Sequence, residues 1–219
     1  MDGYVAGVDE AGRGCVIGPM VVAGVLLKLG ALETLESSGV KDSKKLTAKT
    51  RERLYEVILN EASRLMCVIV DPATIDRYVR FKRRLGGLNV LELEAMVDIL
   101  RGLRPKEAYV DCPDRNLKRF LRGLKSRLPW KLDIKVAHKE FDDHPAVASA
   151  SIVAKVLRDR IVENLRELYG DFGSGYPSDP KTVKFLVEVY EAGHVPSCVR
   201  RSWKLSRLDK FLTRGVGRY

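Results

Sequence analysis

The alternation of short apolar segments with longer segments of helical periodicity constrains the fold of this chain more than any other feature. Residues 4–8 and 20–29 are apolar and of strand length. No long crossover separates these early strands, so they need not lie parallel. The pattern therefore favours an α/β fold, with a mixed sheet flanked by helices and a small helical C-terminal region.

The rest of the chain continues this alternation. Asp9-Glu-Ala-Gly-Arg-Gly14 follows the first strand and is predicted to form a glycine-rich turn. Thr47 and Asp71 are placed to cap the first two helices. Further strands are expected at 65–70, 107–111 and 132–137, and helices at 47–63, 72–80, 89–100, 116–128, 145–169 and 180–191.

The charge balance favours a polyanionic partner. Lysine and arginine number 39 against 29 aspartate and glutamate residues, for a net charge of +10. Each phosphate that a basic side chain neutralises releases bound counterions, which strengthens nucleic-acid binding. The basic residues gather at 80–84, 115–127 and 200–219, although solvated helix faces would explain the same three groups.

Composition also argues against several classes of protein. No apolar run reaches the roughly 18 residues of a membrane span, and residues 2–10 lack the pattern of a signal peptide, so a cytoplasmic protein is expected. The four cysteines, Cys15, Cys67, Cys112 and Cys198, are scattered singly. A zinc site needs clustered ligands, so free and mostly buried thiols are predicted instead.

Acidic residues stand at the ends of two predicted strands. Asp9 and Glu10 follow the first strand, and Asp111 ends the strand 107–111. Ligand sites of α/β sheets gather at such edges, and Mg²⁺ prefers carboxylate oxygens. The glycine-rich segment after Glu10 offers backbone N–H groups to a phosphate, which suggests a metal held between protein and phosphate.

Each acid also has a structural interpretation. Asp9 would cap a turn and Glu10 would be solvated. Asp142 and Asp143 precede Pro145 and would cap the long helix that begins there. Asp159 lies between two arginines and would form a salt bridge on a helix surface. Spacing alone does not show that the acids converge.

Several motifs, in order along the chain, resemble those of type 2 ribonucleases H, the ribonuclease HII family, in its archaeal form. They extend from residue 3 to about residue 205. The motifs are Gly7-Val-Asp-Glu-Ala-Gly-Arg-Gly14, Asp42-Ser-Lys-Lys-Leu46, Val110-Asp111, Ala150-Ser-Ile-Val-Ala-Lys-Val156 with Arg158-Asp159, Gly173-Ser-Gly-Tyr-Pro-Ser-Asp179 and Arg201-Ser-Trp-Lys204.

The resemblance implies a ribonuclease H-like fold with four catalytic acids that bind Mg²⁺ or Mn²⁺. Asp9, Glu10 and Asp111 match the family directly. Family members usually place the fourth acid four residues before the proline that matches Pro145, where this chain has Phe141. Asp142 is therefore assigned as the fourth acid, with Asp143 as the alternative. Asp159 is a candidate supporting acid.

The resemblance also implies how substrate is recognised. Gly12, Arg13 and Gly14 would contact the ribose 2′-hydroxyl and its phosphate, and the 2′-hydroxyl distinguishes RNA from DNA. Tyr176 would stack on the next deoxyribose, unless it packs within its loop. The basic residues assigned to phosphate are Lys44 and Lys45, with Lys155 and Arg158 as weaker candidates.

The implied reaction is two-metal hydrolysis on the 5′ side of a ribonucleotide in an RNA/DNA hybrid or in duplex DNA. It would leave 3′-hydroxyl and 5′-phosphate ends. The alternatives are another nuclease on this fold, such as a resolvase or an exonuclease, and a non-catalytic RNA-binding module. Residues 1–195 would form the catalytic domain, and residues 196–219 a basic helical segment.

The tail adds one partner. Leu208, Phe211 and Leu212 resemble the hydrophobic anchors of a sliding-clamp-binding peptide. The glutamine expected three residues before the leucine is Leu205 here. The alternative is a short amphipathic helix that packs on the domain.

Overall fold

The computed structural model describes residues 3–41, 46–81, 85–138 and 140–203. The chain forms two compact units. The first contains residues 1–11, 21–69 and 88–157, and the second contains residues 12–20, 70–87 and 158–219. Both units draw on distant parts of the chain, and the expected boundary at residue 195 stays a prediction.

The first unit is built on a mixed five-stranded sheet with the strand order β3-β2-β1-β4-β5. β1 pairs antiparallel with β2, whereas β4 runs parallel to both β1 and β5. This is the expected mixed sheet. The strands are β1 (Tyr4–Ala11), β2 (Met20–Lys28), β3 (Ala62–Val70), β4 (Glu107–Asp111) and β5 (Asp133–Ala137).

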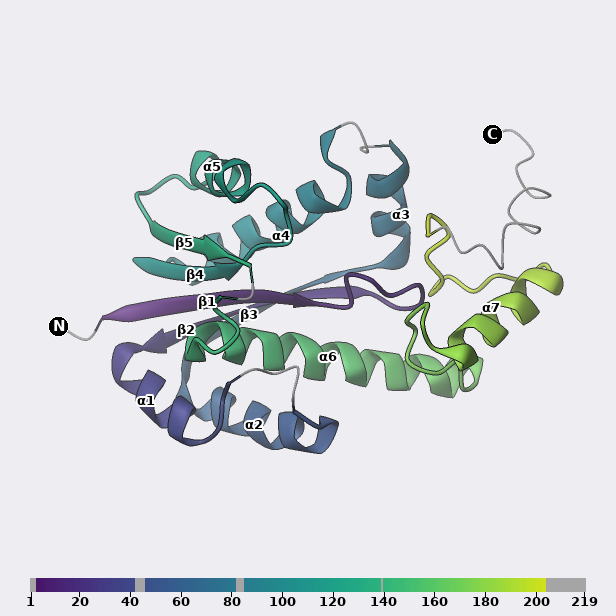
Figure 1. Cartoon of the computed structure of the whole chain (residues 1–219), viewed down its shortest axis with the longest axis horizontal. Coiled ribbons are helices and arrows are strands. Elements are labelled where there is room, and N and C mark those ends of the chain that lie inside the picture. Colours follow the sequence, from purple (N-terminus) through teal and green to yellow (C-terminus); the bar gives the residue numbers. More distant parts are fainter. Residues whose placement is uncertain (1–2, 42–45, 82–84, 139, 204–219) are drawn as a thin grey trace. The chain divides into compact units, whose positions relative to one another are not determined.

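Helices cover both faces of this sheet (Figure 1). α4 (Leu88–Leu103) and α5 (Leu117–Arg127) lie on one face. α1 (Leu29–Ser37), α2 (Ala48–Glu61) and the first part of α6 (Pro145–Tyr169) lie on the other. The expected α/β architecture with flanking helices is therefore confirmed.

Two strand glycines let the helices approach the sheet closely. A Cβ atom at Gly7 would clash with the backbone of Ala146 in α6, and one at Gly24 would clash with Ile99 in α4. Gly24 pairs with Val8, the neighbour of Gly7, so the two glycines face opposite sides of the sheet. Asp9 lies two residues after Gly7 on β1, so it faces the same side of the sheet and points toward α6.

Most expected elements are present, with small shifts at their ends. Thr47 caps α2, because its Oγ1 accepts a hydrogen bond from the Thr50 N–H at 3.1 Å. α1 was not predicted from the sequence. Its N-cap residue, Lys28, makes no side-chain capping bond, and the helix instead buries Ala31 and Leu35.

The glycine-rich turn begins later than predicted. It was expected from residue 9, but β1 continues through Asp9 and Glu10 to Ala11. The cause is β2, which pairs with β1 as far as Ala11 and Val21 and so keeps the backbone extended. Both acids therefore lie on a strand rather than in a turn.

The second unit contains α3 (Pro72–Phe81), the end of α6 and α7 (Pro180–Glu191). Its core joins the loop after β1 to α6, to α7 and to the segment before the tail. The buried residues of this core are Val16, Ile17, Val162, Phe172, Leu186, Cys198 and Val199.

Candidate active site

The ends of β1 and β4 bring three carboxylates together. The parallel ladder between these strands ends at the pair Val8–Val110, one residue before Asp9 and Asp111. Beyond that pair β1 continues against β2 alone. Side chains at the ends of two parallel neighbours can therefore meet where the ladder stops.

Asp9, Glu10 and Asp111 form this group. Each offers a carboxylate oxygen, and the three oxygens lie within 4.8 Å of one another. Asp9 is 8% exposed, and the other two are half-buried. Among the described residues, no other histidine, cysteine or acid joins a group of this kind. The three acids at the strand ends therefore lie together, and their role as a catalytic set stays a prediction.

The environment of Asp9 disfavours its charged form. Burial is the main reason that the pKa of Asp9 is raised from 3.8 to about 6, and the nearby charge of Asp111 raises it further. The Lys155 ammonium and a hydrogen bond from Ser151 act in the opposite direction. Sequence reasoning gave no role to Ser151, which it contains only as part of the motif at 150–156.

These residues suit a divalent cation. Three closely spaced carboxylate oxygens are the hard ligands that Mg²⁺ and Mn²⁺ take. Without a cation, burial and the charge of Asp111 raise the free energy of the ionised Asp9 carboxylate, and a bound cation would relieve that cost. The donor set therefore fits the metal expected from the sequence.

The other candidate acids lie outside this group. Asp142 is half-buried and Asp143 is exposed, and both lie in the turn before α6. Aromatic packing holds this turn, because Phe141 and His144 contact the ring of Tyr109 on β4 at centroid distances of 5.1 and 3.8 Å. Phe141 thus packs at the position where family members usually have an acid.

Asp159 belongs to the second unit and interacts with its neighbour in the chain. Its carboxylate lies 3.4 Å from Nη1 of Arg158. This contact agrees with the salt-bridge interpretation of Asp159. The described structure does not place Asp159 in the carboxylate group.

The loop after β1 contains glycines with different constraints. Gly12 has φ +80°, and a Cβ atom there would lie 2.7 Å from the carbonyl oxygen of Pro19. Gly14 is exposed, and a Cβ atom there would meet nothing within 4 Å. The fold therefore requires glycine at position 12, whereas it leaves the side of Gly14 open.

Tyr176 stands on a loop that Arg158 holds. The Arg158 guanidinium donates to the carbonyl oxygen of Ser174 at 2.7 Å and to Sγ of Cys15 at 3.0 Å, and it lies 5.2 Å from the centre of the Tyr176 ring. Arg158 is only 5% exposed. Burial raises the pKa of Tyr176 to about 12, so its hydroxyl stays neutral. Arg158 thus orders this loop from within the protein.

Some of the residues assigned from the sequence lie outside the described residues. These are Lys44 and Lys45 and the tail residues Leu208, Phe211 and Leu212.

The four cysteines carry no disulfide, as expected, and all except Cys67 are buried. None of the helices in the described part of the chain is long and apolar enough to span a bilayer.

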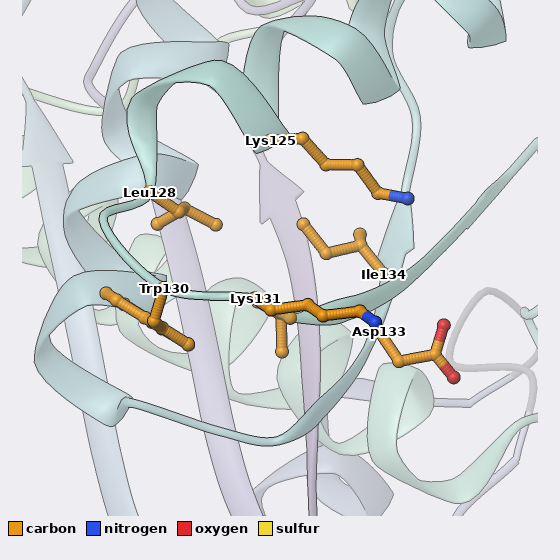
Figure 2. Close-up of a pocket in the computed structure, with 7 residues that line it drawn as sticks. Lys125, Leu128, Trp130, Lys131, Asp133 and Ile134 are labelled. Carbon is orange, nitrogen blue, oxygen red and sulfur yellow. The ribbon is translucent and has the colours of Figure 1, made fainter.

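A cavity of about 490 Å³ opens at the other end of the sheet (Figure 2). It lies between the end of α5 and the start of β5 and is lined in part by Lys125, Trp130 and Lys131. None of the three clustered acids lines it. The carboxylate group therefore forms a site of its own.

Comparison with known proteins assigns the chain to a family. The model of the family "Ribonuclease HII" matches residues 6–206. The chain belongs to the ribonuclease HII family. A Thermococcus onnurineus protein named ribonuclease HII is 44% identical over 214 residues, which cover 96% of this chain and 92% of that protein. The family consists of endoribonucleases, so this chain is a hydrolase of that kind.

Solved structures support the same assignment. Ribonuclease H2 from Pyrococcus horikoshii OT3 is 41% identical, with a TM-score of 0.86 over 96% of this chain and 98% of that one. Ribonuclease HII from Archaeoglobus fulgidus, solved in a complex with PCNA, is 44% identical, with a TM-score of 0.82 over 92% and 96% of the two chains. The fold is therefore that of ribonucleases H.

Proposed function

We propose that this protein hydrolyses the RNA strand of RNA/DNA hybrids and cuts duplex DNA on the 5′ side of an embedded ribonucleotide, leaving 3′-hydroxyl and 5′-phosphate ends. The observation that supports this most directly is the group formed by Asp9, Glu10 and Asp111, in a chain of the ribonuclease HII family. A non-catalytic RNA-binding module would have no use for three acids held together under mutual repulsion.

Asp9, Glu10, Asp111 and Asp142 are the proposed ligands of two divalent ions, Mg²⁺ or Mn²⁺. When bound, such ions activate the attacking water and stabilise the leaving 3′ oxygen. The chain itself prepares the site. Ser151 donates a hydrogen bond to the Asp9 carboxylate, and the charge of Lys155 offsets part of its negative charge. Asp9 is thus oriented before substrate arrives.

Substrate recognition is assigned mainly to loops of the second unit. Backbone groups of Gly12, Arg13 and Gly14 are proposed to contact the 2′-hydroxyl and its phosphate, and the open side of Gly14 leaves room for that contact. Tyr176, 38% exposed, is proposed to stack on the next deoxyribose. Lys44 and Lys45 are proposed to bind phosphate. The inward contacts of Arg158 favour a role in holding the Tyr176 loop.

The test is cleavage of a DNA duplex that contains one ribonucleotide, with an all-DNA duplex and an RNA/DNA hybrid beside it. We expect a single cut on the 5′ side of the ribonucleotide, dependent on a divalent metal, and no cut in the all-DNA duplex. Cleavage of the all-DNA duplex would instead indicate a resolvase or an exonuclease. Metal-independent binding without any cleavage would indicate an RNA-binding module.

The fourth acid is tested by comparing neighbouring variants. We expect Asp142→Asn to lower kcat by at least about tenfold, because a lost ligand positions the ions less well and raises the barrier by more than about 1 kcal/mol. Asp143→Asn is the control and should keep kcat within about twofold, because this side chain is exposed. Steady-state cleavage at saturating Mg²⁺ measures both. The reverse ranking would assign Asp143 instead.

Clamp binding is proposed for the tail. The Archaeoglobus relative was solved with PCNA. In this chain, Leu208, Phe211 and Leu212 resemble the apolar anchors of a clamp-binding peptide. We expect Phe211→Ala to weaken binding to a sliding clamp at least about tenfold in calorimetry, while cleavage of a short duplex is unchanged. Unchanged clamp affinity would support a tail helix that packs on the domain.

A further inference from the structure

Arg200 is a buried cation whose partners are backbone carbonyl groups. It is 2% exposed. Its Nε donates to the Gly18 carbonyl oxygen at 2.9 Å, Nη1 to that of Arg13 at 2.9 Å, and Nη2 to that of Gly12 at 2.7 Å. Its guanidinium carbon lies 5.1 Å from the ring centre of Trp203. From the sequence, Arg200 is only one of the basic residues at 200–219.

Burying a guanidinium is unfavourable unless its donors are satisfied. Burial lowers the pKa of Arg200 to about 10, so the side chain stays protonated at neutral pH. An apolar side chain could fill the same space without the cost of removing a charge from water. It could not hold three carbonyl groups in one direction, which only the planar fork of a guanidinium does. Arg200 therefore acts by fixing the conformation of the loop at 12–18.

The geometry of the peptide bond shows in which direction the N–H groups of this loop point. In a planar trans peptide the C=O of one residue and the N–H of the next point in opposite directions. Because the Gly12 and Arg13 carbonyl oxygens point at Arg200, the N–H groups of Arg13 and Gly14 point away from it. Successive N–H groups directed to one side form a nest that binds anions or hydroxyl oxygens.

Gly14 leaves space for a ligand beside this nest. Gly14 is exposed, and no atom lies within 4 Å of the position that a Cβ would occupy. Peptide 18–19 adds no donor, because Pro19 has no N–H. Arg200 thus fixes two peptide groups whose amides, those of Arg13 and Gly14, point away from its guanidinium.

We propose that Arg200 is the positioning residue that presents the Arg13 and Gly14 amides to the 2′-hydroxyl and phosphate of the ribonucleotide. This inference rests on the proposed function. It adds a residue that acts through the loop and touches no substrate. Discrimination between ribose and deoxyribose then depends on a side chain 186 positions after Gly14 in the sequence.

The backbone around Arg200 is held independently of its side chain. The Arg200 N–H donates to the Val16 carbonyl oxygen at 2.9 Å, and the Gly18 N–H donates to that of Cys198 at 2.8 Å. Ile17 and Val199 form a β-bridge, and both are part of the core of this unit. A variant that changes only the side chain should therefore keep the segment in place.

The experiment measures ribose preference in binding, apart from catalysis. Wild type and Arg200→Lys are titrated in EDTA with two duplexes that differ by one 2′-hydroxyl. A lysine keeps the charge but lacks the fork that reaches three carbonyls. We expect the wild type to bind the ribonucleotide duplex at least about tenfold more tightly than the all-DNA duplex. In Arg200→Lys this ratio of affinities should fall by a factor of at least about five. Affinity for the all-DNA duplex should fall less than affinity for the ribonucleotide duplex, because the all-DNA duplex lacks the 2′-hydroxyl whose contact the variant loses.

Two further variants separate positioning from stability. Leu186→Ala opens a cavity in the same core and should lower Tm while keeping the ribose preference. Arg200→Ala should lose the preference and regain it when millimolar guanidinium, but not sodium, chloride is added. This rescue tests the proposal even if Arg200→Lys fails to fold.

Three results would contradict the proposal, and they can be distinguished. If Arg200→Lys is folded and keeps the full ribose preference, the positioning role of Arg200 is wrong and the proposed function stands. The same holds if Leu186→Ala loses the preference as fully as the Arg200 variants at an equal loss of Tm. If the wild type itself shows no preference and no ribonucleotide-dependent cleavage, the proposed function fails, and the role of Arg200 fails with it.

Discussion

Replacing Asp9 by asparagine should reduce strand cleavage by at least about 100-fold, since the loss of a central metal ligand raises the barrier by several kcal/mol. Asparagine has nearly the same shape, so duplex affinity should change little. The same substitution should stabilise the metal-free protein. A carboxyl whose pKa is raised from 3.8 to about 6 by burial and by Asp111 destabilises the native state when ionised.

The sign of this stability effect follows from proton linkage. The native state binds the Asp9 proton more tightly than the unfolded state does, so stability falls as pH rises from about 4 to about 6 and stays lower above that range. Asparagine does not ionise, so at pH 7 in EDTA the variant should gain about 1–3 kcal/mol, or roughly 2–10 °C in Tm.

Bound metal should reduce or reverse the stability advantage of Asp9→Asn over the wild type. With saturating Mg²⁺ or Mn²⁺ the wild type gains binding free energy that the variant lacks, so the difference in Tm should shrink or change sign. Asp133→Asn, at an exposed position on β5, is the matched control and should alter neither cleavage nor the response to metal. An Asp9→Asn protein that retains cleavage, or that loses stability in EDTA, would contradict the role assigned to Asp9.

Alanine at Gly12 and at Gly14 should have opposite consequences. We expect Gly12→Ala to destabilise the protein by about 1–3 kcal/mol, because its φ is +80° and the new Cβ would lie 2.7 Å from the Pro19 carbonyl oxygen. Gly14→Ala should leave stability within about 0.5 kcal/mol, because its Cβ would meet nothing within 4 Å. Thermal unfolding measures both.

Activity should separate the two glycines further. The added methyl group of Gly14→Ala would occupy the side from which substrate is proposed to approach, so kcat/KM on the single-ribonucleotide duplex should fall at least about tenfold in a fully folded protein. Gly30→Ala, at the start of α1, also places its Cβ in open space and should retain full activity. Wild-type kcat/KM in Gly14→Ala would remove Gly14 from the substrate site.

Local signals explain which parts of the fold could be read from the sequence. Thr47 caps α2 by a hydrogen bond within one turn, and Asp71 does the same for α3 through the Thr74 N–H at 2.9 Å. α1 lacks such a signal and depends on burial of Leu35. The extension of β1 past Val8 was also missed, because it depends on pairing with β2 rather than on the residues 9–11 themselves.

The sequence by itself determined the mixed α/β architecture and most of the helices and strands, because capping and periodicity act over a few neighbours. It also placed Asp9, Glu10 and Asp111 at the ends of strands, while their catalytic role stays a prediction. The tertiary structure alone decided that Asp9 and Asp111 meet, since residues about a hundred positions apart come together only through the parallel register that ends at Val8 and Val110. It also decided that Arg200 points inward, because the three carbonyl groups that satisfy its charge come from a loop far away in sequence. Charge along a chain shows which residues are ionic, but only packing decides which of them are removed from water.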